Sequence, residues 1–225
     1  MNYTIIPEVK ETDAASEHNR VWEPDTSIAV AGGKGYLFAK RALDIAASFC
    51  ALVVLLLPML VVGAMIWLES PGPALFKQER LGKGGKPFMM YKFRSMRVDA
   101  EANGPQWARQ DDDRCTRLGH VLRKSRIDEL PQLWNILRGD MSLVGPRPER
   151  RHFYGKFEAY IPGFRNRLLV QPGLTGLAQV NGGYDLLPEE KIVLDMEYIR
   201  TRSFWMDIKC IFRTIAIVFT HIGAR

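Results

Sequence analysis

Residues 42–68 of the 225-residue chain read ALDIAASFCALVVLLLPMLVVGAMIWL, an almost wholly apolar stretch. Its polar residues, Asp44 and Ser48, lie near its beginning, and it is long enough to cross a lipid bilayer. Pro58 lies near its middle, where a proline removes a helical hydrogen bond and bends the helix axis. The stretch therefore predicts a membrane segment of two helical parts separated by a break at Pro58.

The charges on either side of this stretch indicate how it lies in the membrane. Lys40 and Arg41 precede it, and Lys77 and Arg80 follow it, so positive charge flanks both ends. Because basic flanks stay in the cytoplasm, both ends are expected on that side. We therefore predict a re-entrant helix-break-helix hairpin over residues 34–75, which enters one leaflet and returns. A kinked transmembrane helix and a buried core helix are the alternatives.

The rest of the chain divides into a tail and one domain. Residues 1–33 are polar and contain no apolar run of secretory length, so they predict a disordered cytosolic tail and not a signal peptide. Residues 76–225 suffice for one compact cytosolic catalytic domain. We expect an α+β fold, mostly helical, with short strands and interfacial amphipathic helices. Residues 204–219 have such an interfacial composition, which points to membrane-associated C-terminal helices, although core packing would also explain it.

The charge of the chain predicts an anionic partner. The formal net charge is +6, and basic residues gather in residues 77–97, directly after the membrane segment. Anionic lipid headgroups and phosphorylated substrates both fit this position, whereas no recognition motif for nucleic acid accompanies the charge. The three cysteines and four histidines lack the spacing of a zinc site or a disulfide framework. Asp195 and Asp207 are expected to be solvated or capping residues.

Residues 126–148, RIDELPQLWNILRGDMSLVGPRP, suggest chemistry on a phosphate. Pro131 fits the first turn of a short amphipathic helix that ends at Gly139. The helix is predicted from four apolar residues on one face, Leu130, Leu133, Trp134 and Leu137. Asp128 would lie at its beginning, where the helix dipole keeps a carboxylate ionised for a divalent metal or an attack on phosphorus. A capping Asp128 beside a solvated Glu129 is the alternative.

Cations on either side of the dyad could bind phosphates. Residues 86–96 predict a half-buried strand with Met89, Tyr91 and Phe93 on its buried side. Lys92 and Arg94 would project together from the other side, an arrangement that suits a diphosphate. A salt-bridged outer face would explain the same pattern. Residues 116–124 predict a short helix that carries Arg123 toward the dyad.

Two further segments could also contact a ligand. Arg147 lies between two prolines, which restrict the backbone and fix a guanidinium suited to bidentate phosphate binding. Residues 171–183 are rich in glycine and could bring backbone amides close to a ligand, although turns alone would explain them.

The order of these motifs resembles that of the bacterial sugar transferases, the monotopic polyprenyl-phosphate phosphoglycosyl transferases. The resemblance runs from about residue 40 to residue 213 and is carried by Lys40–Asp44, the proline-containing apolar stretch, Ser70–Pro73, Tyr91–Met96, Leu122–Ser125, Asp128–Gln132, Met141–Pro148 and Pro172–Gly176. Asp113 stands where the family often has proline, and Gly183 stands where many members have arginine. Without the N-terminal transmembrane bundle of larger relatives, the chain resembles the minimal form.

The resemblance implies transfer of a hexose 1-phosphate from a nucleotide diphosphate sugar, with a UDP-sugar as the family expectation, to undecaprenyl phosphate. The step would begin an exopolysaccharide, a lipopolysaccharide or another surface glycan at the cytoplasmic face of the bacterial inner (plasma) membrane. By analogy, Asp128 would attack the sugar-linked phosphorus and form an aspartyl-phosphosugar, which the lipid phosphate then displaces. Asp128 would bind Mg²⁺ and Glu129 would assist with metal or geometry, while Arg123 and Arg147 stabilise phosphate charge.

The expected partners are the nucleotide sugar, undecaprenyl phosphate and membrane lipid, and no nucleic acid. A second copy of the chain and other glycan-assembly enzymes are further expected partners. Two rival functions use the same features. A membrane-associated hydrolase of nucleotide sugars would deliver the phosphate to water, and a non-catalytic adaptor would use the membrane segment and the basic region to organise glycan assembly.

Overall fold

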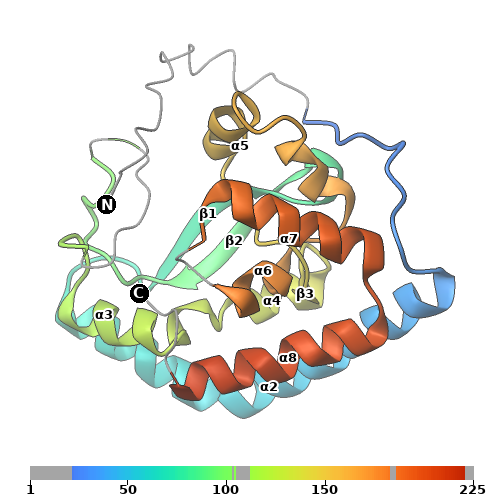
Figure 1. The fold of residues 1–225 in the computed structure, drawn as a ribbon. Coiled ribbons are helices and arrows are strands. Elements are labelled where there is room, and N and C mark those ends of the chain that lie inside the picture. The colour runs from blue at the N-terminus through green and yellow to red at the C-terminus, as the bar shows by residue number, and fades with distance from the viewer. Residues whose placement is uncertain (1–21, 103, 105–111, 183–185, 221–225) are drawn as a thin grey trace.

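The computed structural model describes residues 22–220 except 103, 105–111 and 183–185. Its elements run in the order α2 (Lys34–Glu69), β1 (Leu75–Leu81), η1 (Lys83–Gly85), β2 (Pro87–Phe93), α3 (Arg117–Lys124), η2 (Ile127–Glu129), α4 (Gln132–Arg138), β3 (Ser142–Val144), α5 (Arg151–Glu158), η3 (Phe164–Leu169), β4 (Gly173–Thr175), α6 (Leu177–Asn181), α7 (Pro188–Thr201) and α8 (Phe204–Thr220). Helices predominate (Figure 1), as the sequence predicted.

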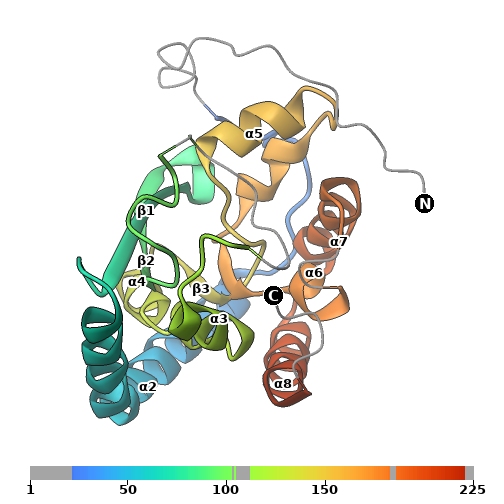
Figure 2. The same ribbon diagram turned by 90° about the vertical axis from the view of Figure 1, so that its left-hand side faces the viewer.

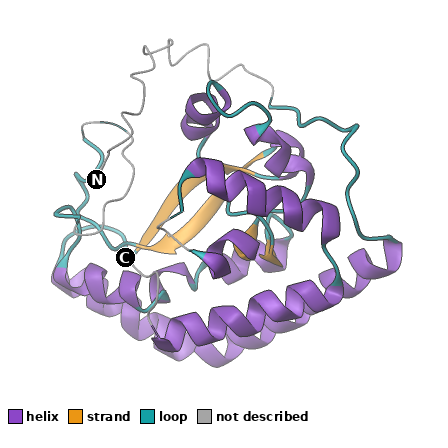
Figure 3. Ribbon diagram, viewed as in Figure 1, coloured by secondary structure: helices purple, strands orange, loops and turns teal. Residues whose placement is uncertain are grey.

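The strands form two small two-stranded sheets, which lie above α2 in the view of Figure 3. β1 and β2 are antiparallel and form a hairpin, with Leu75 opposite Phe93. β2 is the half-buried strand that was predicted within residues 86–96. The predicted buried side of that strand is wrong in part. Met89 is 42% exposed, whereas its neighbour Met90 is buried, because Met90 packs against Leu133 of α4.

β3 and β4 are parallel and meet where three glycines touch. A Cβ on Gly145 would lie 2.3 Å from the Gln171 carbonyl oxygen, and a Cβ on Gly176 would lie 2.2 Å from the Gly145 oxygen. Gly173 is equally confined. These glycines in the segment 171–183 therefore allow two stretches of backbone to approach each other, and packing within the chain accounts for them.

The apolar segment is one continuous helix, α2, with Pro58 inside it. The predicted break at Pro58 is therefore wrong. The axis bends, however, since the blue and teal parts of α2 run in different directions in Figure 2. A proline removes one hydrogen bond and kinks a helix without having to end it. The alternative of a buried core helix is also wrong, because only 6% of the most apolar 18-residue stretch of α2 is buried. By length and composition, α2 could cross a membrane.

A polar stripe on α2 attaches this helix to the rest of the protein. Its members are spaced by four residues and share one helix face. They are Tyr36, Lys40, Asp44 and Ser48. Asp44 Oδ1 accepts hydrogen bonds from the Leu143 amide at 2.9 Å and from Ser142 Oγ at 3.1 Å, so α2 is bonded to β3. The two polar residues of the apolar stretch thus face the rest of the protein.

Asp207 of α8 is the other half of this attachment. Its carboxylate accepts hydrogen bonds from Lys40 Nζ at 2.9 Å, Tyr36 OH at 2.8 Å and Tyr198 OH at 2.7 Å. The expectation of a solvated or capping Asp207 is therefore wrong. The outer side of α8 leaves Trp205 and other large apolar residues exposed, as an interfacial helix would.

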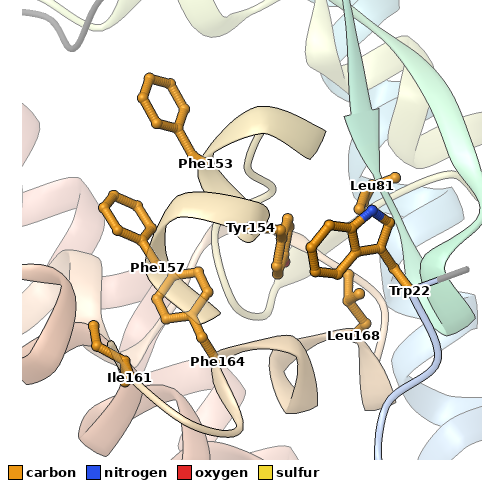
Figure 4. Close-up of a cluster of buried hydrophobic side chains, with 8 residues drawn as sticks. All are labelled: Trp22, Leu81, Phe153, Tyr154, Phe157, Ile161, Phe164 and Leu168. Atoms are coloured by element: carbon orange, nitrogen blue, oxygen red, sulfur yellow. The ribbon is translucent and has the colours of Figure 1, made fainter. Parts of the chain in front are cut away.

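The segment before α2 is part of the core. Residues 22–33, which we call the N-terminal strap, were expected to be disordered, and this is wrong. Trp22 is buried in the aromatic cluster of Figure 4, with its ring 6.1 Å from that of Tyr154. Ala31 donates to the Ile199 carbonyl and accepts from Arg202 Nε. Residues 1–21 of the predicted tail lie outside the described residues.

The helix after the dyad, α4, runs from Gln132 to Arg138, and Gly139, whose φ of 94° favours glycine, caps its end. That predicted end is confirmed. The predicted apolar face is wrong in part, because Trp134 is 49% exposed while Asn135 is buried. Asn135 is buried because its side chain bonds the backbone of β2, donating to the Met89 carbonyl at 2.7 Å and accepting from the Tyr91 amide at 3.0 Å.

Candidate functional site

A cavity of about 340 Å³ is lined by residues of the β1–β2 hairpin and of the segments around the dyad. Five of the six residues expected in the site line it, namely Lys92, Arg94, Arg123, Asp128 and Arg147. The sixth, Glu129, does not line the cavity but forms ion pairs with two residues that do, Lys92 and Arg147. The fold therefore brings together side chains from β2, α3, η2 and the segment after β3.

The dyad is placed by a sharp turn of the backbone between α3 and α4. Arg126, which precedes η2, has a φ of 61°, a left-handed conformation that is uncommon outside glycine. The turn buries both carboxylates but gives them different neighbours. Asp128 lines the cavity, whereas Glu129 Oε1 accepts from Arg147 Nη2 at 2.5 Å and lies 3.5 Å from Lys92 Nζ.

These surroundings shift the pKa values of the two carboxyl groups in opposite directions. Burial, and then the negative charge of Glu129, raise the pKa of Asp128 to about 6, although Lys92, Arg123 and Arg147 oppose the rise. Burial alone would raise the pKa of Glu129 too, but the nearby cations, Arg147 first, outweigh burial and lower that pKa. The helix dipole therefore does not set the pKa of Asp128, although a carboxyl with a pKa of about 6 is still mostly ionised at neutral pH. α4 begins only at Gln132, and burial dominates.

Lys92 and Arg94 do not act as a pair. The strand ends at Phe93, so Lys92 reaches Glu129 while Arg94 turns to the end of α2. There the Arg94 guanidinium donates to the carbonyl oxygens of Pro71 at 2.5 Å and Ser70 at 2.7 Å. Arg94 therefore lines the cavity with a side chain that already bonds the end of α2 to β2.

Arg123 is carried to the cavity by α3, as predicted. Thr116 caps this helix by accepting the Gly119 amide at 2.9 Å, which fixes its start. Arg123 lies in the last turn, and its Nη1 lies 3.6 Å from Cys115 Sγ. Its charge faces the dyad, because it lowers the pKa of Asp128.

Sequence reasoning missed residues at the other end of the cavity. Arg167 of η3 lines it and pairs with Asp195 of α7, Nε to Oδ2, at 2.6 Å. Both side chains are only 1% exposed, so the expectation of a solvated or capping Asp195 is wrong. Gln179 of α6 also lines the cavity. A pair 28 residues apart leaves no local pattern, and the nearest signal was the glycine-rich segment that contains Gln179.

The acidic residues fit a magnesium ion only if the substrate supplies most of its ligands. Among the described residues no group of three or more His, Cys, Asp or Glu side chains could hold a metal. Mg²⁺ commonly takes one or two protein carboxylates together with substrate phosphates and water. Asp128 can supply one such carboxylate, while Glu129 binds Arg147 and Lys92. The donor set is compatible with a metal that arrives with a diphosphate.

Comparison with known proteins gives a consistent result. The profile of the family described as "Bacterial sugar transferase" matches residues 35–221. The chain is 47% identical over 193 residues to a "UDP-N-acetylgalactosamine-undecaprenyl-phosphate N-acetylgalactosaminephosphotransferase" of Aeromonas hydrophila, covering 84% of this chain and 46% of that protein, so it spans less than half of that relative.

Two other relatives are covered more fully. A "UDP-glucose:undecaprenyl-phosphate glucose-1-phosphate transferase" of Caulobacter vibrioides is 46% identical over 191 residues, which are 82% of this chain and 71% of that protein. The "Exopolysaccharide production protein PSS" of Rhizobium leguminosarum is 42% identical over 197 residues, which are 82% of this chain and 97% of that protein. By the extent of these matches, the chain belongs to the bacterial sugar transferase family.

Proposed function

We propose that this protein transfers a hexose 1-phosphate from a nucleotide diphosphate sugar, with a UDP-sugar as the expected donor, to undecaprenyl phosphate. The observation that carries the proposal is a buried carboxylate, Asp128, at a cavity surrounded by Lys92, Arg123 and Arg147. The names of the relatives supply the substrates, since they include UDP-glucose and UDP-N-acetylgalactosamine transferases that act on undecaprenyl phosphate. The product would begin an exopolysaccharide or another surface glycan.

The first step uses Asp128 as a nucleophile. Its ionised oxygen attacks the phosphorus that carries the hexose, and an oxygen–phosphorus bond forms as the bond to the second phosphate breaks. The nucleoside monophosphate leaves with the electron pair. Arg147 and Lys92 stabilise the charge on the phosphoryl oxygens, and Glu129 holds both cations in place through its own ion pairs.

The second step regenerates the enzyme. An oxygen of the lipid phosphate attacks the same phosphorus, and the bond to Asp128 breaks, which returns the carboxylate and leaves a lipid-linked diphosphate sugar. Mg²⁺, held by Asp128 and the donor diphosphate, would neutralise phosphate charge when bound. A low-dielectric pocket strengthens these interactions, since charges attract more strongly where water is excluded.

The location follows from the lipid acceptor. α2 and α8 present large apolar side chains to the outside, among them Leu57, Trp67, Trp205 and Phe212. We propose that α2 is re-entrant in the bacterial inner membrane, with both ends on the cytoplasmic face. A second copy of the chain and other glycan-assembly enzymes are proposed neighbours at that surface.

Release of nucleotide from a panel of UDP-sugars, with Mg²⁺ and detergent-purified protein, tests the proposal. We expect UMP release that needs undecaprenyl phosphate for sustained turnover and disappears in Asp128→Asn. The exposed acid Asp99 provides the control Asp99→Asn, which should keep the wild-type rate. Equal release without lipid would indicate a hydrolase. An adaptor would show no release with any UDP-sugar, and its biological function would survive Asp128→Asn.

The topology of α2 requires a separate test. Single cysteines placed at residue 34 and at residue 83 in a background without the native cysteines can be labelled from either side of sealed vesicles. Equal accessibility from the cytoplasmic side is expected of a re-entrant helix. Accessibility of the two sites from opposite sides would establish a transmembrane helix instead.

A further inference from the structure

The end of the cavity away from the dyad is walled by a buried ion pair. Arg167 Nε donates to Asp195 Oδ2, and Arg167 Nη2 donates to the Arg147 carbonyl oxygen at 2.9 Å. Asp195 neutralises the charge of Arg167, so the pair presents hydrogen-bond donors without a net charge. Arg167 Nη1 is buried and has no hydrogen-bond partner among the residues that the structure describes.

Gln179, which lines the same cavity, also has buried polar atoms without a hydrogen-bond partner among the described residues. These atoms are Nε2 and Oε1. The amide lies beside the segment that leads to Arg147, because a Cβ on Gly176 would lie 2.7 Å from Gln179 Oε1 and 2.2 Å from the Gly145 oxygen. Buried polar atoms without a partner are costly and rare, so three of them around one cavity point to a ligand.

The charges divide the cavity into two regions. Around the dyad, four cations, Lys92, Arg123, Arg126 and Arg147, face two carboxylates, which leaves a positive excess for phosphates. At the other end most of the charge is paired, although Lys191 of α7 also lines the cavity there, close to Arg167 and Glu149. Arg167 is paired with Asp195, and Arg80 lies 3.2 Å from Glu149. The positive excess is therefore larger around the dyad, and an anionic group is attracted more strongly to the first region than to the second.

We infer that Arg167 and Gln179 form a hydrogen-bonding subsite for the uncharged part of the nucleotide-sugar donor. The inference rests on the proposed function. A primary amide offers donors and an acceptor together, and Arg167 Nη1 adds a donor, which matches hydroxyl and acetamido groups that both donate and accept. The hydroxyls of the hexose and those of the nucleoside share this chemistry.

Gln179→Leu tests the subsite, because leucine fills a similar volume and removes both polar atoms. Asn181→Ala is the matched control, since Asn181 belongs to the same helix but is exposed and bonds Arg213. For each variant we would measure KM and kcat with UDP-glucose and with UDP-N-acetylgalactosamine, the inhibition constant of UMP, and the melting temperature. Gln179→Asn, which withdraws the amide by one methylene, serves if the leucine variant does not fold.

Loss of one neutral hydrogen bond should raise the KM of the donor about tenfold in Gln179→Leu, with little change in Asn181→Ala. If the hexose occupies the subsite, UMP inhibits both proteins equally and the preference between the two UDP-sugars changes. If the nucleoside occupies it, KM and the UMP inhibition constant rise together. Either pattern supports the inference.

Three results would overturn it. Unchanged KM and unchanged UMP inhibition in a folded Gln179 variant mean that the subsite does not bind the donor, and a lower melting temperature with wild-type KM means that Gln179 is purely structural. In both cases UMP release that is lost in Asp128→Asn leaves the proposed function standing. No release by wild-type protein from any UDP-sugar would refute the proposed function and the subsite with it.

Discussion

Lys40 Nζ and Asp207 Oδ2 are 2.9 Å apart in a buried contact between α2 and α8. The same ammonium donates to the Val144 carbonyl oxygen at 2.9 Å, and Tyr198 OH, which donates to Asp207 Oδ1, lies 3.2 Å from that oxygen. Val144 ends β3, directly before the segment that holds Arg147. The apolar helix is thus bonded to the backbone that carries Arg147, the residue proposed to bind phosphate.

Lys40→Met should destabilise the protein, because it leaves the buried Asp207 carboxylate without its cation. We expect a loss of about 3 kcal/mol in the free energy of unfolding, as is typical when one partner of a buried pair is removed. Lys34→Met is the control, since Lys34 is exposed at the start of the same helix. Denaturant unfolding in detergent measures both variants, and equal stability of the two would contradict the structural role of the pair.

Asp128→Asn should abolish turnover and yet stabilise the fold. The pKa of Asp128 is raised from 3.8 to about 6 in the folded protein, so ionisation of this carboxyl above that pH disfavours folding. Asparagine removes this cost, and we expect a gain of about 2 kcal/mol in the free energy of unfolding at pH 8. The gain should shrink as the pH falls from 6 to 4. A lower melting temperature for Asp128→Asn at pH 8 would refute the assignment of Asp128 as a strained, buried acid.

The pH dependence of kcat/KM should report the same group. Because the nucleophile must be ionised, activity should fall as the pH drops through about 6, well above the range of an ordinary aspartate. Lys92→Met removes a cation that lowers the pKa of Asp128, so the acidic limb should move to higher pH. Glu129→Gln removes a negative charge that raises this pKa, so the limb should move to lower pH. If the acidic limb moved in the same direction in both variants, Asp128 would be ruled out as the titrating group.

Arg94→Leu separates two roles of one residue. Arg94 bonds the Ser70 and Pro71 carbonyls at the end of α2, so its loss should lower the free energy of unfolding by about 2 kcal/mol with little change in donor KM. Arg138→Leu, at a half-exposed position outside the cavity, controls for the loss of an arginine. A large rise in donor KM at wild-type stability would instead show that Arg94 binds the diphosphate.

Local patterns in the sequence were sufficient for several elements. The apolar run predicted the helical character of α2, the helix predicted over residues 116–124 corresponds to α3, and Gly139 marks the end of α4. The motifs around Asp128 and Arg147 also predicted a site that the fold assembles. Each of these signals lies within a few residues of the structure that it determines.

Long-range pairs explain most of the errors. Asp207 meets Lys40 across 167 residues of chain and Asp195 meets Arg167 across 28, so neither acid could be distinguished from a solvated one by its neighbours in sequence. Asp128 behaves similarly, because its raised pKa comes from burial that only the assembled fold creates. Alternation also failed at Arg94, where the strand had already ended at Phe93.

The N-terminal strap changes how this protein could be divided. Trp22 precedes α2 in the chain, yet its ring completes a core built from α5 and η3, which follow α2 by many residues. The segment before α2 and the domain after it therefore share one core, so α2 and that domain are interleaved along the chain and not joined end to end. A chimera that exchanges the first 70 residues for another anchor would keep the dyad, Arg123 and Arg147, but it would remove the tryptophan on which Tyr154 packs.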